Sequence, residues 1–344
     1  MPRLRRVSPD SPGWTRRRAG AGFVYLDEDG ERLGADAVRR IKELVIPPAW
    51  EEVWICPLPH GHIQVVGTDD AGRRQYLYHP AWRARRDRMK FDRVKDAAPS
   101  LPRVRRALDR HLALEGMPRE RAGAAAVRLL DLGCFRIGSD VYADANGSFG
   151  LTTLQRQHVR RRGEEMVFLF PGKSGKEHEV VIDDGRVLPV LEEMRRRRGG
   201  SDRLLAYRHG RRWLDLDASA VNEYLAELLD SDLTAKDFRT WHATVLAAVA
   251  LAESDETGVS KASRKRAVRA AVVEVADYLG NTPAVARGSY IDPQVLERYD
   301  DGLVLDPARW ARCRSPESRQ HQRELGVLDL LGDDPAGSDR VRRR

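Results

Sequence analysis

Gly280-Asn281-Thr282-Pro283, with Gly288-Ser289-Tyr290 shortly after it, is the stretch on which the interpretation of this chain depends. Residues 260–278 have helical spacing, and Gly280 is typical of the residue that ends a helix because glycine adopts the left-handed conformation without strain. Tyr290 lies nine residues after Asn281. The stretch therefore predicts an amide and a phenol just beyond the end of a long helix.

Three upstream stretches carry cations that could act together with this phenol. They are Phe135-Arg136-Ile137-Gly138, Phe170-Pro171-Gly172-Lys173 and Lys236-Asp237-Phe238-Arg239-Thr240. Taken singly, Arg136 could be a helix cap or a surface ion pair, and Lys173 could be a solvated lysine in a β-turn. The meaning of these residues comes from their joint occurrence with Tyr290.

A phosphodiester is the substrate that suits two arginines, a lysine, a polar side chain and a phenol. A guanidinium fork binds two phosphoryl oxygens at once, a lysine can protonate a departing alkoxide, and a phenol can attack phosphorus. The sequence contains no cluster of metal-ligating residues, so we expect neither a metal nor another cofactor.

In this order, the motifs resemble those of type IB DNA topoisomerases of the small bacterial, poxvirus-like kind, over about residues 20–300. That family has an arginine in an Arg-Ile-Gly turn, a lysine in a Phe-x-Gly-Lys hairpin, an arginine in Lys-x-x-Arg-Thr, a histidine and a tyrosine. Matched residue by residue, the resemblance implies as catalytic residues Arg136, Lys173, Arg239 and Tyr290.

Asn281 fills the position of the family's usual histidine. An amide can donate one hydrogen bond to a phosphoryl oxygen but cannot carry positive charge. We therefore expect Asn281 to be catalytic, with more of the charge stabilisation resting on the arginines. The alternative is that Asn281 only caps the preceding helix.

The resemblance also implies contacts with duplex DNA, which would come from Gln75, Tyr76, Tyr78, Tyr142 and Lys236. Ser139 stands where viral members place a base-contacting lysine. This difference puts the tight sequence preference of the viral enzymes in doubt for this chain.

The mechanism that the resemblance implies needs neither ATP nor metal. Tyr290 would attack the scissile phosphorus and form a 3′-phosphotyrosyl link, while Arg136 and Arg239 stabilise the developing charge. Lys173 would protonate the leaving 5′ oxygen as general acid. Lys176 and His178 remain competing candidates for that role.

Composition agrees with a nucleic-acid partner. The 344 residues carry a net charge of +8, with 33% charged and 41% hydrophobic residues. Such a basic balance favours a polyanionic partner, although an arginine-rich composition can also reflect a GC-rich genome. Three separated cysteines and no long apolar run predict a cytoplasmic, nucleoid-associated protein without contact to a membrane.

Local patterns predict an α+β protein with a small β-rich N-terminal domain and a larger, mainly α domain. The resemblance implies that the larger part is a catalytic domain of the type IB topoisomerase and tyrosine recombinase kind. We expect a monomer that clamps DNA. The expected parts are a basic mobile arm, a β-rich clamp domain, a catalytic domain and a polar, disordered tail, at residues 1–20, 21–88, 89–332 and 333–344.

Several expectations concern single elements. Residues 149–159 resemble a strand, residues 195–200 an exposed loop, and residues 81–95 a polar connection between lobes. Asp217 and Thr234 are expected helix N-caps. Lys236 and Arg239, three residues apart, are expected on one helix face.

Two other classes compete with this interpretation. A tyrosine recombinase would place histidine three residues before the second arginine, where this chain has Lys236, and would precede its tyrosine with Leu-Gly-His, where the chain has Leu279-Gly280-Asn281. A non-enzymatic basic DNA-binding protein would explain the charge but not the ordered set of motifs.

Overall fold

The computed structural model describes residues 3–132, 135–138, 147–172, 175, 177–229, 232–254 and 260–343. The chain divides into two compact units, Met1–Lys90 and Phe91–Arg344. The boundary falls within helix α2 (Pro80–Ala97). Among the described residues, no helix is both long enough and apolar enough to cross a membrane.

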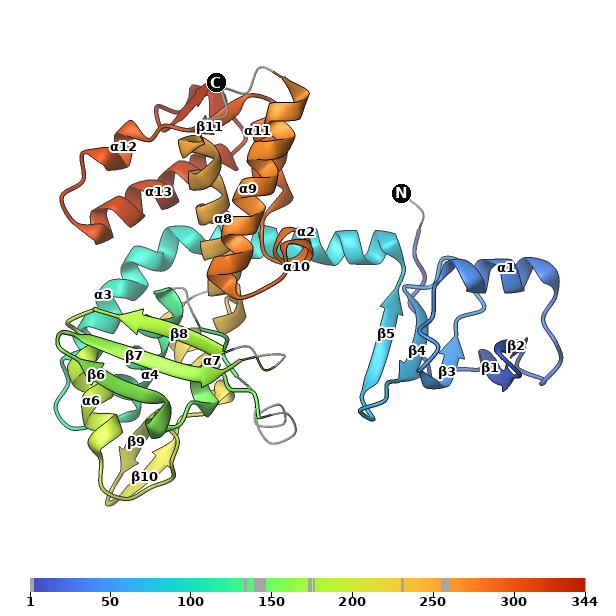
Figure 1. The fold of residues 1–344 in the computed structure, drawn as a ribbon, viewed down its shortest axis with the longest axis horizontal. Helices are drawn as coiled ribbons and strands as arrows, with labels where there is room; N and C mark the ends of the chain where they lie inside the picture. The colour runs from blue at the N-terminus through green and yellow to red at the C-terminus, as the bar shows by residue number, and fades with distance from the viewer. Residues whose placement is uncertain are drawn as a thin grey trace. The chain divides into compact units, whose positions relative to one another are not determined.

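The N-terminal unit is built on an antiparallel sheet in the order β2-β1-β3-β4-β5 (Figure 1). Its elements are β1 (Trp14–Ala19), β2 (Gly22–Leu26), α1 (Ala35–Glu43), β3 (Glu51–Ile55), β4 (Ile63–Thr68) and β5 (Arg74–Tyr78). A small core of Ile41, Val53, Ile55 and Val65 lies between α1 and the sheet. Burial alternates along β5: Arg74, Tyr76 and Tyr78 are exposed while Gln75 and Leu77 are partly buried, so one face of this strand stays in water.

The larger unit is mainly helical and carries a three-stranded antiparallel sheet in the order β6-β7-β8 (Figure 1). Its first half contains α3 (Leu101–Leu112), α4 (Arg119–Asp131), β6 (Val159–Arg162), β7 (Glu165–Pro171), β8 (Glu177–Ile182), α6 (Leu188–Arg196), β9 (Ala206–His209), β10 (Arg212–Asp215) and α7 (Ala218–Leu228). The second half contains α8 (Ala235–Glu253), α9 (Lys261–Leu279), α10 (Pro283–Ser289), α11 (Pro293–Asp300), β11 (Leu303–Leu305), α12 (Ala308–Ala311), α13 (Pro316–Leu330) and β12 (Val341–Arg343).

Helix α8 is the central helix of the larger unit. Nearly all of its residues are buried, which is expected for a helix that is surrounded by others and has no wide polar face. It begins at Thr234, whose backbone N–H and hydroxyl both donate to the carboxylate of Asp237, at 2.9 and 2.8 Å. Helix α9 lies beside α8 (Figure 1). This arrangement fixes the start of one helix and the end of the other within one core.

The predicted caps at Asp217 and Thr234 are confirmed. Asp217 accepts a hydrogen bond from the Ala220 N–H at 2.8 Å, and Thr234 forms a capping box with Asp237. Ser260 likewise caps α9, and Gly280 ends it with φ of 60°. Thr282 caps the short helix α10, with Pro283 in its first turn.

The expectation of a mobile arm was wrong for residues 14–19, which form β1. The strand pairs with β2 and β3, and the Arg16 guanidinium donates to the carbonyls of Pro47 and Trp50 at 2.6 and 2.7 Å. The disordered tail was also wrong for residues 341–343, because β12 pairs with β11 and Val341 is buried. The polar composition of both segments hid the fact that each forms a strand paired with another strand of the chain.

Residues 149–159 do not form the expected strand. Leu151–Thr153 and Arg156–His158 are 3₁₀ turns, and β6 begins only at Val159. The Leu151 and Thr152 N–H groups donate instead to the carbonyls of Arg136 and Ile137, at 2.7 and 2.9 Å. This pairing attaches the Arg136 segment to the rest of the core.

Two connections also differ from their expected form. Residues 81–95 are part of helix α2, and α6 continues to Arg196. Arg197, which was expected in an exposed loop, is buried because its guanidinium donates to the carbonyls of Met194 and Leu204, at 2.8 and 2.9 Å. A stretch of charged residues can therefore include a buried side chain whose charge is satisfied by backbone carbonyls.

Candidate active site

The turn Leu279–Asn281 at the end of α9 binds both predicted arginines. Gly280 takes the left-handed conformation, which ends the helix and frees its last carbonyls. Arg239 Nη2 donates to the Leu279 carbonyl at 2.7 Å, and Arg136 Nη2 donates to the Gly280 carbonyl at 3.1 Å. One turn of backbone thus fixes two guanidinium groups that come from distant parts of the sequence.

Asn281 has a defined side-chain orientation. Its Oδ1 accepts a hydrogen bond from Arg136 Nη2 at 2.6 Å, and because a guanidinium can only donate, the oxygen must face Arg136. The Nδ2 atom is buried and has no hydrogen-bond partner among the described residues. A donor is therefore available beside the two arginines.

The helix cap does not need the Asn281 side chain. The backbone N–H of Asn281 donates to the Ala276 carbonyl at 2.8 Å, and the conformational requirement is met by Gly280. Any residue with a backbone N–H could make the same bond. The capping explanation of Asn281 therefore does not account for its side chain.

Arg239 is buried, with 3% of its surface exposed. Its Cζ lies 5.5 Å from the centre of the Tyr290 ring. Burial lowers the pKa of Arg239, and the nearby phenol of Tyr290 acts in the opposite direction. A cation held in so dry a place interacts strongly with any negative charge that forms nearby.

Tyr290 follows α10 directly and is half-buried against the main core. Its N–H donates to the Ala286 carbonyl at 3.0 Å, and its carbonyl lies 3.3 Å from the hydroxyl of Thr244 on α8. The same hydroxyl accepts from the Asp292 N–H at 3.1 Å. Helix α8 therefore carries Arg239 and also binds the backbone at the Tyr290 carbonyl and at Asp292, just after the tyrosine.

The sequence interpretation missed Thr244 as a residue that supports the site. The available signal was weak, since Thr244 lies one helical turn after Thr240 in a stretch that is otherwise apolar. Threonine in such a position is commonly explained by a bond to the carbonyl four residues earlier, which Thr244 also makes at 2.9 Å.

A small hollow joins these parts, lined by Arg136, Phe149, Phe170, Gly172, His178, Arg239 and Leu279. Aromatic rings form part of its wall, while the two guanidinium groups supply positive charge. Within the described residues, no group of His, Cys, Asp and Glu side chains could hold a metal ion.

The structure thus brings together four of the five predicted catalytic residues, namely Arg136, Arg239, Asn281 and Tyr290. Lys173, Tyr142, Ser139 and Lys176 lie outside the described residues. Lys236 is exposed, whereas Arg239 is buried, so the two do not share an environment although both lie near the start of α8.

In the N-terminal unit, Tyr76 and Tyr78 lie on the same face of β5. Their rings stack with centroids 6.0 Å apart, and each residue is 39% exposed. Gln75 alternates with them along the strand, and its Nε2 donates to Asp69 Oδ2 at 2.9 Å. The two tyrosines therefore present an exposed aromatic surface, while Gln75 is held by a neighbouring carboxylate.

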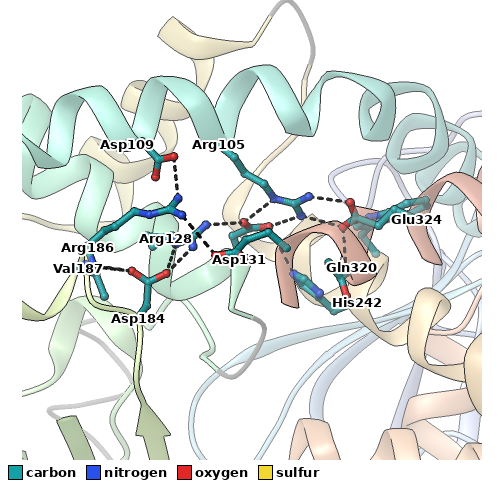
Figure 2. A network of polar contacts seen from close by, with 12 residues as sticks. Arg105, Asp109, Arg128, Asp131, Asp184, Arg186, Val187, His242, Gln320 and Glu324 are labelled. Atoms are coloured by element: carbon teal, nitrogen blue, oxygen red, sulfur yellow. Dashed lines mark hydrogen bonds and ion pairs between the residues drawn. The ribbon is translucent and has the colours of Figure 1, made fainter. Parts of the chain in front are cut away.

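A buried polar network supports α8 (Figure 2). Arg105 on α3 binds Asp131 on α4 and Glu324 on α13, with distances of 2.8 and 2.7 Å, and Trp241 on α8 donates to Glu324 at 3.3 Å. Burial alone would raise the pKa of Asp131, but Arg105 holds that pKa below its usual value. Burial lowers the pKa of His242, which lies beside Asp131.

Comparison with known proteins shows which family the chain resembles. A family model described as "Eukaryotic DNA topoisomerase I, catalytic core" matches residues 79–304, and one described as "Bacterial DNA topoisomerase IB, N-terminal domain" matches residues 22–69. The "DNA topoisomerase 1B" of Acanthamoeba polyphaga mimivirus is 29% identical, over 84% of this chain and 88% of the viral protein. The "DNA topoisomerase 1B" of Vaccinia virus (strain Copenhagen) is 24% identical, over 76% and 79%.

The catalytic-core match covers more than half of the chain, so the protein belongs to the DNA topoisomerase I family. It is an isomerase that acts on DNA. Within that family it is a type IB enzyme of the small bacterial kind, as its N-terminal domain and its viral relatives indicate. The α+β fold expected from the sequence is confirmed.

Proposed function

We propose that this enzyme relaxes supercoiled duplex DNA by transient cleavage of one strand, rotation and religation, without ATP or metal. The observation that carries the proposal is the placement of Tyr290 beside Arg239, with Arg136 and the free donor of Asn281 around the same turn. A phenol close to guanidinium groups and a neutral donor is the set that an attack on a phosphodiester needs.

In the proposed reaction, Tyr290 Oη forms a bond to the scissile phosphorus while the bond from phosphorus to the 5′ oxygen breaks. The phenol loses its proton to solvent water as it attacks, and Lys173 gives a proton to the departing 5′ oxygen. An ordinary phenol has a pKa of about 10, so nearby cations are needed to favour the phenoxide. Arg239 and Arg136 supply that charge.

Preorganisation of the arginines supports this assignment. Both donate to carbonyls of the turn 279–280, so their positions are set before any substrate binds. A guanidinium has five N–H donors, which leaves Arg136 with donors for phosphoryl oxygens. Donors that are fixed in advance stabilise developing charge without reorganisation, often by a few kcal/mol each.

Religation follows from the same chemistry. The 3′-phosphotyrosyl bond retains the energy of the phosphodiester, and the free 5′-hydroxyl can attack it after the DNA has rotated. The step needs no external energy source, which is why ATP is dispensable in the proposal.

We also propose how the rest of the chain contributes. The enzyme acts as a monomer, residues 21–88 grip the duplex through Gln75, Tyr76 and Tyr78, and residues 89–332 carry the chemistry. Tyr142 and Lys236 add contacts to DNA in the second part. The exposed pair of tyrosines on β5 supports the first of these roles.

The test is relaxation of negatively supercoiled plasmid by the full-length enzyme, with chelator present and ATP absent. We expect a ladder of relaxed topoisomers on plasmids of unrelated sequence. Activity only on plasmids with a particular pair of sites would indicate a tyrosine recombinase instead. Binding without any relaxation would indicate a non-enzymatic DNA-binding protein.

A further inference from the structure

His178 on β8 lines the candidate active site, although the sequence indicated it only as a competing candidate for the general acid. It is paired with Phe170 across β7 and β8, and the two rings stack with centroids 5.6 Å apart and planes 19° apart. The residue also lines the hollow that contains Arg136 and Arg239. Its ring therefore has a fixed place beside both arginines.

Two glycines make room for this ring. A Cβ added to Gly172 would overlap Cδ2 and Nε2 of His178, and a Cβ added to Gly280 would overlap Cε1. The imidazole is thus in close contact with two backbone segments that are distant in sequence. One is the end of β7, and the other is the end of α9.

The two glycines have different reasons for being glycine. Gly280 needs the left-handed conformation, with φ of 60°, as well as space for the ring. Gly172 has no positive φ, so the contact with His178 is the reason the structure offers for the absence of a side chain there. That contact can therefore be tested at Gly172 without straining the backbone.

We propose that His178 is a positioning residue for the transesterification, an inference that rests on the proposed function. Its ring is a spacer that sets the distance between the end of β7 and the turn 279–281. Gly172 directly precedes Lys173 in the chain, and Gly280 directly precedes Asn281 while its carbonyl binds Arg136. The ring thereby fixes Gly172, the residue before Lys173, relative to the turn that binds the arginines.

The expected effect is on rate and not on binding. Misplacement of reacting groups by about 1 Å can cost about 10²-fold in rate. Removing the His178 ring should let the two backbone segments shift by less than about 1 Å. The rest of the surface that would contact the duplex is unchanged. We therefore expect slower cleavage at saturating DNA, with an almost unchanged Kd.

The experiment measures single-turnover cleavage of a suicide DNA substrate at saturating enzyme, together with Kd and the unfolding temperature. His178→Ala should cleave on the order of tenfold more slowly. His178→Phe keeps a ring but has no proton to give, and it should stay within about threefold of the unaltered enzyme. Gly172→Ala should slow cleavage because its methyl group displaces the ring.

Matched controls are available in the same unit. Gly185 is exposed, has ordinary backbone geometry and has open space around it, so Gly185→Ala should cleave at the normal rate. His209 is exposed on β9, and His209→Ala should do the same. The double variant His178→Ala/Gly172→Ala should cleave faster than the product of the two single effects predicts, because the added methyl group then meets no ring.

Two results would overturn the inference. His178→Ala cleaving at the normal rate would show that the spacer is not needed. If His178→Phe were as slow as His178→Ala, and a 5′-bridging sulfur in the substrate rescued both, then His178 would be the general acid and not a spacer. Failure of the unaltered enzyme to cleave at all would instead contradict the proposed function.

Discussion

The amide nitrogen of Asn281 is left without a hydrogen-bond partner among the described residues, while Arg136 binds the side-chain oxygen. If the free Nδ2 donates to a phosphoryl oxygen, Asn281→Ala should slow transesterification by about 10²-fold or somewhat less. DNA affinity should hardly change, since the contact strengthens mainly in the transition state. Asn281→His should keep substantial activity, because an imidazole nitrogen can replace the amide donor.

Single-turnover cleavage and thermal unfolding, measured on the same samples, decide this prediction. The backbone N–H of Asn281 makes the helix-ending bond in every variant, so the unfolding temperature should change little. A normal cleavage rate together with a lowered unfolding temperature would remove Asn281 from the active site.

Lys173 is predicted to be the general acid. Lys173→Ala should therefore slow cleavage of an ordinary substrate, and a 5′-bridging sulfur at the scissile bond should restore most of the lost rate. A thiolate leaves without needing a proton, so the acid becomes dispensable. Rescue of Lys176→Ala in place of Lys173→Ala would make Lys173 a phosphate contact only.

Helix α8 carries residues of the candidate site together with residues that stabilise the core. Arg239 and Thr244 support the site, while His242 and Trp241 join the buried network that contains Arg105, Asp131 and Glu324 (Figure 2). His242 is buried among these charges, and its pKa is lowered by burial. Protonation of His242 is therefore linked to the stability of the helix that holds Arg239.

This linkage predicts a loss of stability in mild acid. A histidine whose pKa is lowered in the folded state stabilises the protein fully above its ordinary pKa of about 6.5, and that contribution declines as the pH falls below it. The slope for one proton is at most about 1.4 kcal/mol per pH unit. The pKa of Asp131 is also lowered, so its carboxylate stabilises the folded protein at neutral pH. That contribution is lost only below about pH 4, outside the range in which His242 titrates.

Denaturant unfolding between pH 7.5 and 5 measures the effect. The free energy of unfolding should fall over this range in the unaltered protein, and His242→Gln should flatten the decline because glutamine does not titrate. The exposed variant His209→Ala is the control and should keep the full slope. An equal slope in His242→Gln would assign the pH dependence to other groups.

Helix and strand boundaries were predictable from the sequence where a side chain within the same turn sets them. The caps at Asp217 and Thr234 and the glycine at 280 follow from side chains that act within one turn. Residues 149–159 were not predictable, because their N–H groups bond to Arg136 and Ile137, which a period-two pattern does not reveal. Strand β12 was missed for a similar reason, since its partner β11 lies more than thirty residues earlier.

The candidate site was predictable through motifs and not through geometry. Arg136, Arg239, Asn281 and Tyr290 were found because their order along the chain matches one family. The contacts made by Thr244 and His178 depend on packing between elements that are distant in sequence. No spacing along the chain indicates that an imidazole fills the gap between Gly172 and Gly280.

At the scale of the whole molecule, the two units are expected to divide grip and chemistry. The larger unit has an extensive core of its own, and Arg136, Arg239, Asn281 and Tyr290, the proposed catalytic residues among those described, all belong to it. A fragment that starts near Arg85 should therefore retain weak cleavage of suicide substrates. It should bind DNA less tightly, with a shallower dependence of log K on log salt, because fewer phosphates are contacted.

Titration of DNA binding at several salt concentrations tests this division, with the full-length protein as reference. An equal salt slope for fragment and full-length protein would show that residues 1–80 do not bind the duplex. The stacked pair Tyr76 and Tyr78 would then be ordinary exposed strand residues.

The identity of the nucleophile is the most direct test of the whole account. The covalent complex formed on a suicide substrate is trapped, digested with protease and nuclease, and the modified peptide is sequenced by mass spectrometry. The account predicts a 3′-phosphonucleotide on Tyr290, and no covalent complex from Tyr290→Phe although that variant still binds duplex DNA. An adduct on Tyr278, which is 41% exposed on α9, or a covalent complex from Tyr290→Phe, would contradict it.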